Sequence, residues 1–292
     1  MKRILVPLDG SHLAEAILPI VEEWAKEEGA DVMLLRAVMA HHLPFRDRTD
    51  EEVHAIREAE KYLETVADGL ERRGLPKVRF TVWYDEPTTA IVEAAARDKA
   101  DLIAMATHGR SGLSRLLLGS VAEAVERSSQ VPVLLLRGQS AWKPWATGKI
   151  LVPLDGSETA EAILPVVERL AGPRDLTVSL LEVVVPFPSA AHAELASHAD
   201  ELMAFRHGEA TRYLDKVAPP LRAKGLKVEC AVKVGNAVDA ITTLAAHERA
   251  DLVAMVTHGR KGLGRLAFGS VAEGVLRTAA VPVLLLKAHE AD

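Results

Sequence analysis

The chain has 292 residues, a formal net charge of −6 and 49% apolar residues. At roughly 100–200 residues per domain, this length favours two domains, each large enough to bury its own core. The basic residues are scattered, which argues against a nucleic-acid partner. A membrane partner is not expected either, since no apolar run approaches the roughly 20 residues that cross a bilayer.

The single cysteine, Cys230, cannot form an internal disulfide and fits a reducing compartment. Its place in an alternating strand pattern suggests a small buried side chain. Residues 1–9 already have the pattern of a strand, so we expect no signal peptide before the fold. Together these observations predict a cytoplasmic protein.

In the first half of the chain, short apolar runs alternate with longer amphipathic ones. Strands are predicted at residues 3–8, 32–39, 78–83, 102–106 and 132–136. Helices are predicted between them, at residues 11–28, 51–73, 87–97 and 120–127. Pro19 falls inside the first of these helices, where a proline predicts a kink.

The second half repeats the first. Residues 4–22 match residues 150–168 at 16 of 19 positions, and residues 107–125 match residues 257–275 at 14 of 19. Strands are accordingly predicted at residues 150–154, 176–185, 228–234, 252–256 and 282–286. Such a duplication indicates two copies of one domain in tandem.

Near-continuous apolar strands separated by helices are typical of a parallel sheet that is buried on both faces. We therefore predict an α/β fold with two tandem doubly wound domains, each a five-stranded parallel sheet with helices on both faces. The predicted domains span residues 1–138 and 149–292. Residues 139–148, which fit neither periodic pattern, are the predicted linker.

Both repeated motifs follow the carboxyl ends of strands, where open α/β sheets bind ligands. Pro7-Leu8-Asp9 ends the first strand and Ala106-Thr107-His108 ends the fourth, so we expect the two ends to meet in one crevice. Asp9, like Asp155 in the second half, suits ribose hydroxyls or a divalent cation beside phosphates. The alternative is that Asp-Gly-Ser is simply a turn that leads into a helix.

A glycine-bearing loop before the last helix of each half is the predicted phosphate cradle, because backbone amides and the helix amino terminus attract anions. The alternative for each is a tight turn followed by an ordinary serine N-cap. The cradle residues are Gly109, Gly119 and Ser120, with Gly259, Gly269 and Ser270 in the second half.

Charged side chains in these loops have equally open interpretations. Arg110, Arg115, Arg260 and Arg265 either neutralise phosphates or are solvated, and His108 and His258 have no visible partner for acid–base chemistry. The chain has neither of the standard glycine-rich nucleotide motifs and no nucleophile elbow, so we predict no catalytic residue.

A VPLDGS first strand and a T-H-G-R-x-G-x6-G-S loop occur together in each half. With these motifs the chain resembles a tandem universal stress protein over both halves. Members that bind ATP have a G-x2-G-x9-G-[ST] loop, whose second and third glycines match Gly109 and Gly119, and whose hydroxyl matches Ser120. Its first glycine is replaced by Ala106 in one half and by Val256 in the other.

The resemblance implies a nucleotide site in each half. The family's first-strand aspartate matches Asp9 and Asp155, and the strand end that meets adenine falls near Val38 and Val184. The implied ligands are ATP and, at the two aspartates, Mg²⁺ or Mn²⁺. The full set of predicted binding residues is Pro7, Asp9, Val38, Ala106, Gly109, Arg110, Gly119, Ser120 and Val121, with Pro153, Asp155, Val184, Gly259, Gly269, Ser270 and Val271.

Three classes of function follow from this sequence. The first is a cytoplasmic stress-response protein that binds ATP and acts as a nucleotide-sensitive regulator with at most slow hydrolysis. The second is an interaction module of the same fold that binds no nucleotide. The third, a nucleotidyltransferase, would need an H-x-G-H motif, which the chain lacks.

Two further expectations concern the relation between the halves. The apolar last strands, at residues 131–137 and 281–287, are edge candidates, so the halves are expected to form an internal pseudo-dimer. A homodimer of two chains is open, since the sequence does not decide it. The first half should bind nucleotide better than the second. Val256 brings a branched side chain where the family's ATP binders have glycine, and Ala106 adds only a methyl group.

Overall fold

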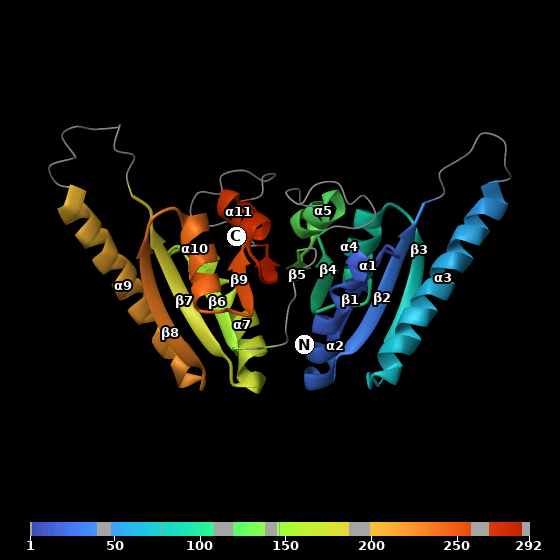
Figure 1. Ribbon diagram of the computed structural model, residues 1–292, viewed down its shortest axis with the longest axis horizontal. Coiled ribbons are helices and arrows are strands. Elements are labelled where there is room, and N and C mark those ends of the chain that lie inside the picture. Colours follow the sequence, from blue (N-terminus) through green and yellow to red (C-terminus); the bar gives the residue numbers. More distant parts are fainter. Residues whose placement is uncertain are drawn as a thin grey trace. The chain divides into compact units, whose positions relative to one another are not determined.

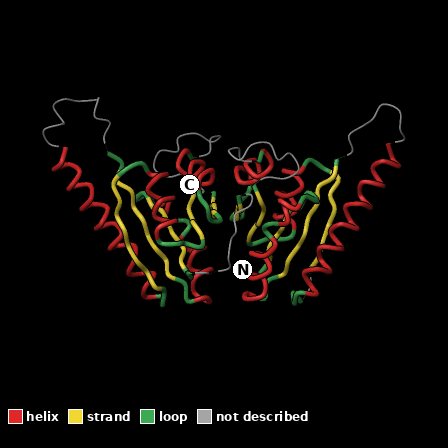
Figure 2. The backbone as a smooth tube through the Cα atoms, viewed as in Figure 1, coloured by secondary structure: helices red, strands yellow, loops and turns green. Residues whose placement is uncertain are grey.

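We determined the architecture from a computed structural model, in which the chain divides into two units, Met1–Pro144 and Trp145–Asp292. The structure describes residues 2–39, 48–76, 78–107, 119–137, 145, 147–186, 199–257 and 269–287. The division falls inside the segment 139–148 that the sequence predicts as a linker. Figure 1 shows the elements of each unit, and Figure 2 shows its strands side by side with helices packed on them.

The first unit is a five-stranded parallel sheet in the order β3-β2-β1-β4-β5. The helix α3 packs along β2 and β3, and α4 packs against α5. Right-handed crossovers place α2 and α3 on one face of the sheet, and α4 and α5 on the other. The elements are β1 (Arg3–Pro7), α1 (His12–Glu15), α2 (Leu18–Glu28), β2 (Asp31–Val38), α3 (Arg48–Arg72), β3 (Val78–Tyr84), α4 (Pro87–Arg97), β4 (Leu102–Ala106), α5 (Ser120–Ser128) and β5 (Val133–Leu136).

The second unit repeats this topology with the order β8-β7-β6-β9-β10, again parallel throughout. The predicted fold class, two doubly wound α/β domains, is therefore confirmed. The elements are β6 (Lys149–Leu154), α6 (Glu158–Glu161), α7 (Leu164–Ala171), a 3-10 turn (Gly172–Arg174), β7 (Thr177–Val184), α9 (Ala199–Ala223), β8 (Lys227–Val234), α10 (Ala237–His247), β9 (Leu252–Val256), α11 (Ser270–Thr278) and β10 (Val283–Leu286).

The kink predicted at Pro19 is a complete break between two helices. α1 ends at Glu15, and Pro19 lies in the first turn of α2, where a backbone N–H needs no partner within the helix. Pro165 has the same place in α7. The predicted helix over residues 11–28 is therefore two helices, and the short first one follows directly from the turn after β1.

The central strands of each unit are buried on both faces, as their apolar sequences predict. Ile4, Leu5 and Val6 of β1 are at most 1% exposed, and all five residues of β4 are buried. The interpretation of Cys230 as a buried side chain is wrong, since Cys230 is exposed. The reason is its strand: β8 is the outer strand of its unit, and most of its residues are only partly covered.

An aspartate ties the amino ends of the two central strands together in each unit. Asp101, just before β4, accepts the backbone N–H groups of Lys2 and Arg3 at 2.6 and 3.0 Å. Asp251 accepts those of Thr147 and Lys149, at 3.2 and 3.1 Å to Oδ2. These bonds fix β1 beside β4 and β6 beside β9, and so determine which strand ends meet at the opposite edge of the sheet.

Candidate functional site

The strand order reverses between β1 and β4, because β2 and β3 lie on one side of this pair and β5 on the other. Ile4 pairs with Leu102 and Leu5 with Ile103, so the two strands run in step to their carboxyl ends. The second unit has the same register, with Ile150 opposite Leu252. The prediction that the ends of the first and fourth strands of each half lie side by side is thus confirmed for the described residues, while the crevice itself stays a prediction.

Asp9 is held at this edge by the turn that follows β1. Its Oδ1 accepts the backbone N–H of Ser11 at 2.9 Å, and Ser11 Oγ caps α1 by accepting the N–H of Ala14 at 3.1 Å. Gly10 has a φ of 87°, in the left-handed region that glycine adopts most easily. The predicted turn is therefore present, and it fixes the direction of the carboxylate.

Asp155 occupies the same turn in the second unit. Its Oδ1 accepts the backbone N–H of Ser157 at 3.1 Å and the Ser157 hydroxyl at 2.5 Å. Gly156, with a φ of 79°, takes the place of Gly10. Both predicted aspartates are half-buried and lie just after the carboxyl ends of their strands.

The glycine loop of each unit is closed by a backbone hydrogen bond. The N–H of Gly119 donates to the carbonyl of Thr107 at 2.7 Å, and that of Gly269 donates to Thr257 at 3.1 Å. The N–H of Thr107 donates in turn to Leu136 at 2.9 Å, which anchors the loop to β5. The start of α5 is therefore held beside the end of β4.

The alternative that Ser120 is an ordinary N-cap is wrong. The N-cap of α5 is Gly119, in an extended conformation, and Ser120 is the first helical residue. Gly269 and Ser270 have the same places at the start of α11. Because glycine has no side-chain oxygen, the N-cap residue itself does not cap the first amides of either helix, and amides at a helix amino terminus favour an anion.

The remaining predicted residues divide into those at the strand ends and those outside the described residues. Pro7, Val38 and Ala106 are buried at the ends of β1, β2 and β4, and Pro153, Val184 and Val256 have the same places in the second unit. Ser120 and Ser270 are exposed, whereas Val121 and Val271 are half-buried. Gly109, Arg110 and Gly259 lie outside the described residues, as do His108, Arg115, His258, Arg260 and Arg265.

Sequence reasoning missed a polar cluster beside Asp9. The Tyr62 hydroxyl, from α3, donates to Glu15 Oε1 of α1 at 2.8 Å, and the Arg36 guanidinium of β2 lies 5.1 Å from the centre of the Tyr62 ring. Burial raises the pKa of Tyr62, as do its bond to Glu15 and the charges of Glu15 and Asp9, while Arg36 opposes them. Asp9 and Arg36 are therefore close enough to act on the same tyrosine.

The second unit has a tyrosine in the same place, Tyr213 of α9. Burial raises its pKa, and the carboxylates of Glu161, Glu182 and Asp155 raise it further. The signal for this cluster was present in the repeat, since KYLE at residues 61–64 corresponds to RYLD at residues 212–215. Each unit therefore has a polar cluster beside the aspartate that follows its first strand.

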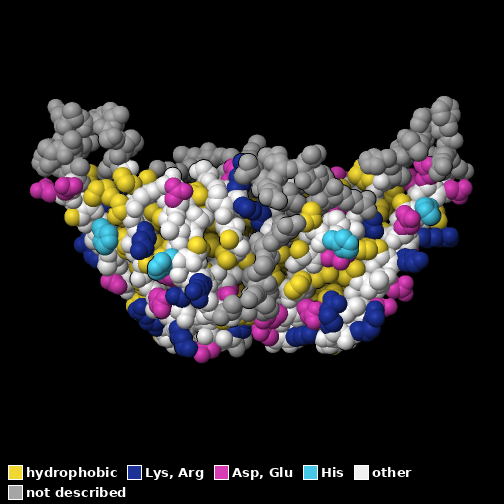
Figure 3. Space-filling view, in the orientation of Figure 1, with side chains coloured by type: hydrophobic (Ala, Val, Ile, Leu, Met, Phe, Trp, Pro, Cys, Tyr) yellow, Lys and Arg dark blue, Asp and Glu magenta, His cyan; other side chains and the backbone are white. Residues whose placement is uncertain are grey.

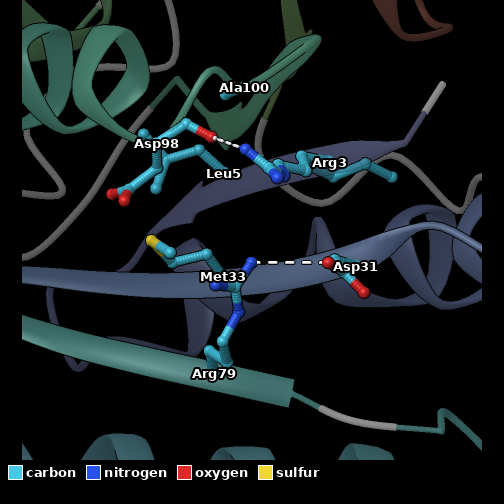
Figure 4. Close-up of a pocket in the computed structure, with 8 residues that line it drawn as sticks. Arg3, Leu5, Asp31, Met33, Arg79, Asp98 and Ala100 are labelled. Carbon is cyan, nitrogen blue, oxygen red and sulfur yellow. Dashed lines mark hydrogen bonds and ion pairs between the residues drawn. The ribbon is translucent and has the colours of Figure 1, made fainter.

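A small hollow lies at the other edge of the first sheet (Figure 4). Arg3 Nη1 donates to the carbonyl of Asp98 at 2.6 Å, and Arg79 Nη2 lies 3.4 Å from Asp31 Oδ2. These residues are at the amino ends of the strands, whereas ligands of such sheets bind at the carboxyl ends. We therefore assign a structural role to these contacts.

The residues that the structure describes contain no group of three or more His, Cys, Asp or Glu side chains arranged to hold a metal ion. Across the same ranges, no helix combines the length and apolar character needed to span a bilayer. On the face seen in Figure 3, basic and acidic side chains are interspersed.

Comparison with known proteins gives one family. The sequence model of the Universal stress protein family matches residues 1–137 and again residues 147–287. A universal stress protein of Methanocaldococcus jannaschii is 34% identical over 140 residues, which are 47% of this chain and 82% of that protein. One from Mycobacterium bovis is 28% identical over 217 residues, covering 72% of this chain and 69% of its own length.

A solved structure shares the whole fold. The crystal structure of a universal stress protein from Archaeoglobus fulgidus superposes with a TM-score of 0.76 and covers 98% of both chains. Its sequence identity is 23%, so this likeness bears on the architecture.

Proposed function

The chain is a tandem member of the universal stress protein family, and we propose that it binds ATP in the strand-end crevice of its first unit. One observation carries this proposal: the carboxylate of Asp9 and the amino terminus of α5 face the same edge of the sheet, at the switch point between β1 and β4. A carboxylate suits ribose hydroxyls, and a helix amino terminus suits phosphates.

The other predicted residues extend this crevice. Val38 ends β2, next to β1, and offers backbone groups for a purine base, while Val121 lies in the first turn of α5. Adenine binding through backbone groups is implied by the family resemblance. Gly109 and Arg110 complete the proposed set from outside the described residues.

A divalent cation fits this crevice only together with the nucleotide. Mg²⁺ in nucleotide sites is commonly bound by one or two carboxylates and by the phosphates themselves. Asp9 supplies one carboxylate, and Asp155 supplies one in the second unit. We propose that each aspartate contributes to Mg²⁺ or Mn²⁺ binding when phosphates are present.

In this proposal the protein is a cytoplasmic regulator whose state depends on bound nucleotide. We expect at most slow hydrolysis, because His108 and His258 have no partner visible in the sequence that would make them a base for water. We also propose that residues 139–148 are the linker, and that the halves pair as a pseudo-dimer through their last strands. In each unit taken alone, β5 and β10 are the edge strands of the sheet.

The first test is to denature the purified chain and identify any released nucleotide by mass. The second uses Asp9→Ala and Gly119→Val, each of which should weaken ATP binding about ten- to a hundredfold, since a charge-assisted contact is worth about 1.5–3 kcal/mol. Gly119 has a φ of −62°, which valine adopts readily, so this variant should fold. Asp155→Ala and Gly269→Val are the matched controls in the second unit.

If both first-unit variants fold and bind ATP as tightly as the parent chain, the proposed ATP site in this crevice is wrong. The interaction-module alternative would then hold for the first unit.

The two crevices should differ in affinity. Val256 ends β9 where Ala106 ends β4, and its branched side chain takes up more room at the strand end. The first unit should therefore be the tighter site, and Val256→Gly should strengthen ATP binding by the second. Calorimetric titration of the full chain checks this expectation. Two equal sites before substitution, or no gain after it, would show that this position does not control access.

A further inference from the structure

One position in the wall of the crevice carries opposite charges in the two units. Arg36 and Glu182 follow Leu35 and Leu181, which pair with Pro7 and Pro153 in the same register. Arg36 and Glu182 are therefore structurally equivalent, and both are half-buried. The neighbouring motifs at the ends of β1 and β6 are nearly identical in the two units, so the difference in charge at this position is an exception.

Arg36 lies on the face of the first unit's sheet that α3 covers. Its guanidinium lies 5.1 Å from the centre of the Tyr62 ring. The Tyr62 hydroxyl donates a hydrogen bond to Glu15 of α1, the helix that follows the Asp9 turn. Residues two apart in a strand share a face of the sheet, so Arg36 also lies on the same side of β2 as Val38. Here one cation accompanies the carboxylates of Asp9 and Glu15.

The corresponding wall of the second unit has three carboxylates near Tyr213, and Arg206 of α9 donates to the carbonyl of Val185, just beyond β7, at 2.7 Å. Glu182, Glu161 and Asp155 all act on Tyr213, and all three raise its pKa after the effect of burial. Compared with the first unit, a guanidinium has been replaced by a third carboxylate. At this one position the difference is two unit charges, and in a partly buried site it acts on a nearby ligand more strongly than in open water.

We propose that the residue at this position, Arg36 in the first unit and Glu182 in the second, selects which crevice accepts a polyanionic nucleotide. Arg36 lowers the negative potential that ATP meets, and Glu182 raises it. This inference rests on the proposed nucleotide site and adds its specificity determinant: the second crevice disfavours anionic ligands by charge, independently of the space taken by Val256.

The test exchanges the two residues in the full chain. Arg36→Glu and Glu182→Arg each introduce the residue that the equivalent place in the other unit already holds, so both variants should fold. Arg36→Gln is the neutral control. ATP and uncharged adenosine are titrated into each by calorimetry at low salt, because a potential acts on the phosphates and only weakly on the nucleoside.

We expect Arg36→Glu to weaken ATP binding by the first unit about tenfold or more, with adenosine changed less than about twofold and Arg36→Gln intermediate. Glu182→Arg, combined with Val256→Gly, should bind ATP at the second unit more tightly than Val256→Gly alone. Added salt should reduce both differences.

Three outcomes would overturn the proposal. Equal loss of ATP and adenosine in Arg36→Glu would show that Arg36 acts through packing. Unchanged ATP binding in the exchanged variants would show that the charge has no effect, although the nucleotide site stands. A parent chain that binds neither ATP nor adenosine would remove the proposed function itself, and this inference with it.

Discussion

At the scale of single residues, Gly274 shows how the two copies have diverged in compensating ways. A Cβ atom built on Gly274 in α11 would lie 2.5 Å from Cγ2 of Val238 in α10. The first half has Ala124 and Thr88 at the corresponding places. In the second unit the Val238 side chain thus occupies the space that a Cβ atom at position 274 would need.

We predict that Gly274→Ala destabilises the second unit. Alanine normally stabilises a helix by about 1 kcal/mol relative to glycine. Here the clash with the stiff Val238 side chain should reverse the sign and cost about 1–3 kcal/mol. Urea denaturation measures the effect, and Val238→Ala in the same chain should relieve it. A more stable Gly274→Ala variant would show that the two helices separate without strain.

At the scale of elements, a glutamate joins two helices of the first unit. Glu22 of α2 accepts Lys26 Nζ and Arg73 Nε, each at 2.7 Å, and Arg73 follows the end of α3. Burial raises the pKa of Glu22, but the hydrogen bonds and charges of Lys26 and Arg73 outweigh it and hold the pKa below 4.5. The second unit keeps one such bridge, between Glu168 and Lys224 at 2.7 Å.

Glu22→Gln should therefore have a pH-dependent effect. A lowered carboxyl pKa stabilises the folded state above the unfolded value of 4.5, and this stabilisation is lost as the pH falls below it. We expect a cost of about 1 kcal/mol at pH 7, because both cationic partners are largely exposed, and a smaller cost near pH 3.5. Denaturation at the two pH values provides the measurement. An equal cost at both would assign the effect to packing.

The elements also show what the sequence could and could not predict. Buried strands such as β4 were predictable to the residue, since parallel strands covered on both faces are continuous apolar runs. Cys230 was misplaced because an alternating pattern does not tell an outer strand from an inner one. The Tyr62 cluster was missed because it joins three elements that only the folded topology brings together. The predicted contributions of Gly109 and Arg110 stay predictions.

At the scale of the whole molecule, the proposed pseudo-dimer depends on which way β5 presents its backbone. The N–H of Ile103 donates to the carbonyl of Pro132, and that of Thr107 donates to Leu136, so even-numbered residues of β5 face β4. A residue in a strand points its N–H and carbonyl to the same side. The backbone groups of Val133 and Leu135 therefore point away from β4.

Leu135→Pro should weaken pairing of the halves without breaking the sheet of the first unit. Proline removes one outward N–H and leaves the hydrogen bonds to β4 in place, as edge prolines do. Limited proteolysis at residues 139–148 cuts the chain between its halves, and size-exclusion chromatography then shows whether the halves stay together. We expect the halves of the Leu135→Pro chain to separate more readily than those of the parent. Leu134→Pro, which removes an inward N–H, should instead destabilise the unit. Identical elution of cleaved parent and Leu135→Pro chains would argue against pairing through this strand.

The backbone bond that closes each glycine loop has a consequence for how this protein can change. Gly119 bonds to Thr107 and Gly269 bonds to Thr257, and each bond closes a stretch of eleven residues, 108–118 or 258–268. The scaffold thus joins Thr107 to Gly119 and Thr257 to Gly269 through main-chain atoms. Because neither closing bond uses a side-chain atom, a substitution by any residue other than proline at Gly119 or Gly269 keeps both atoms of the bond.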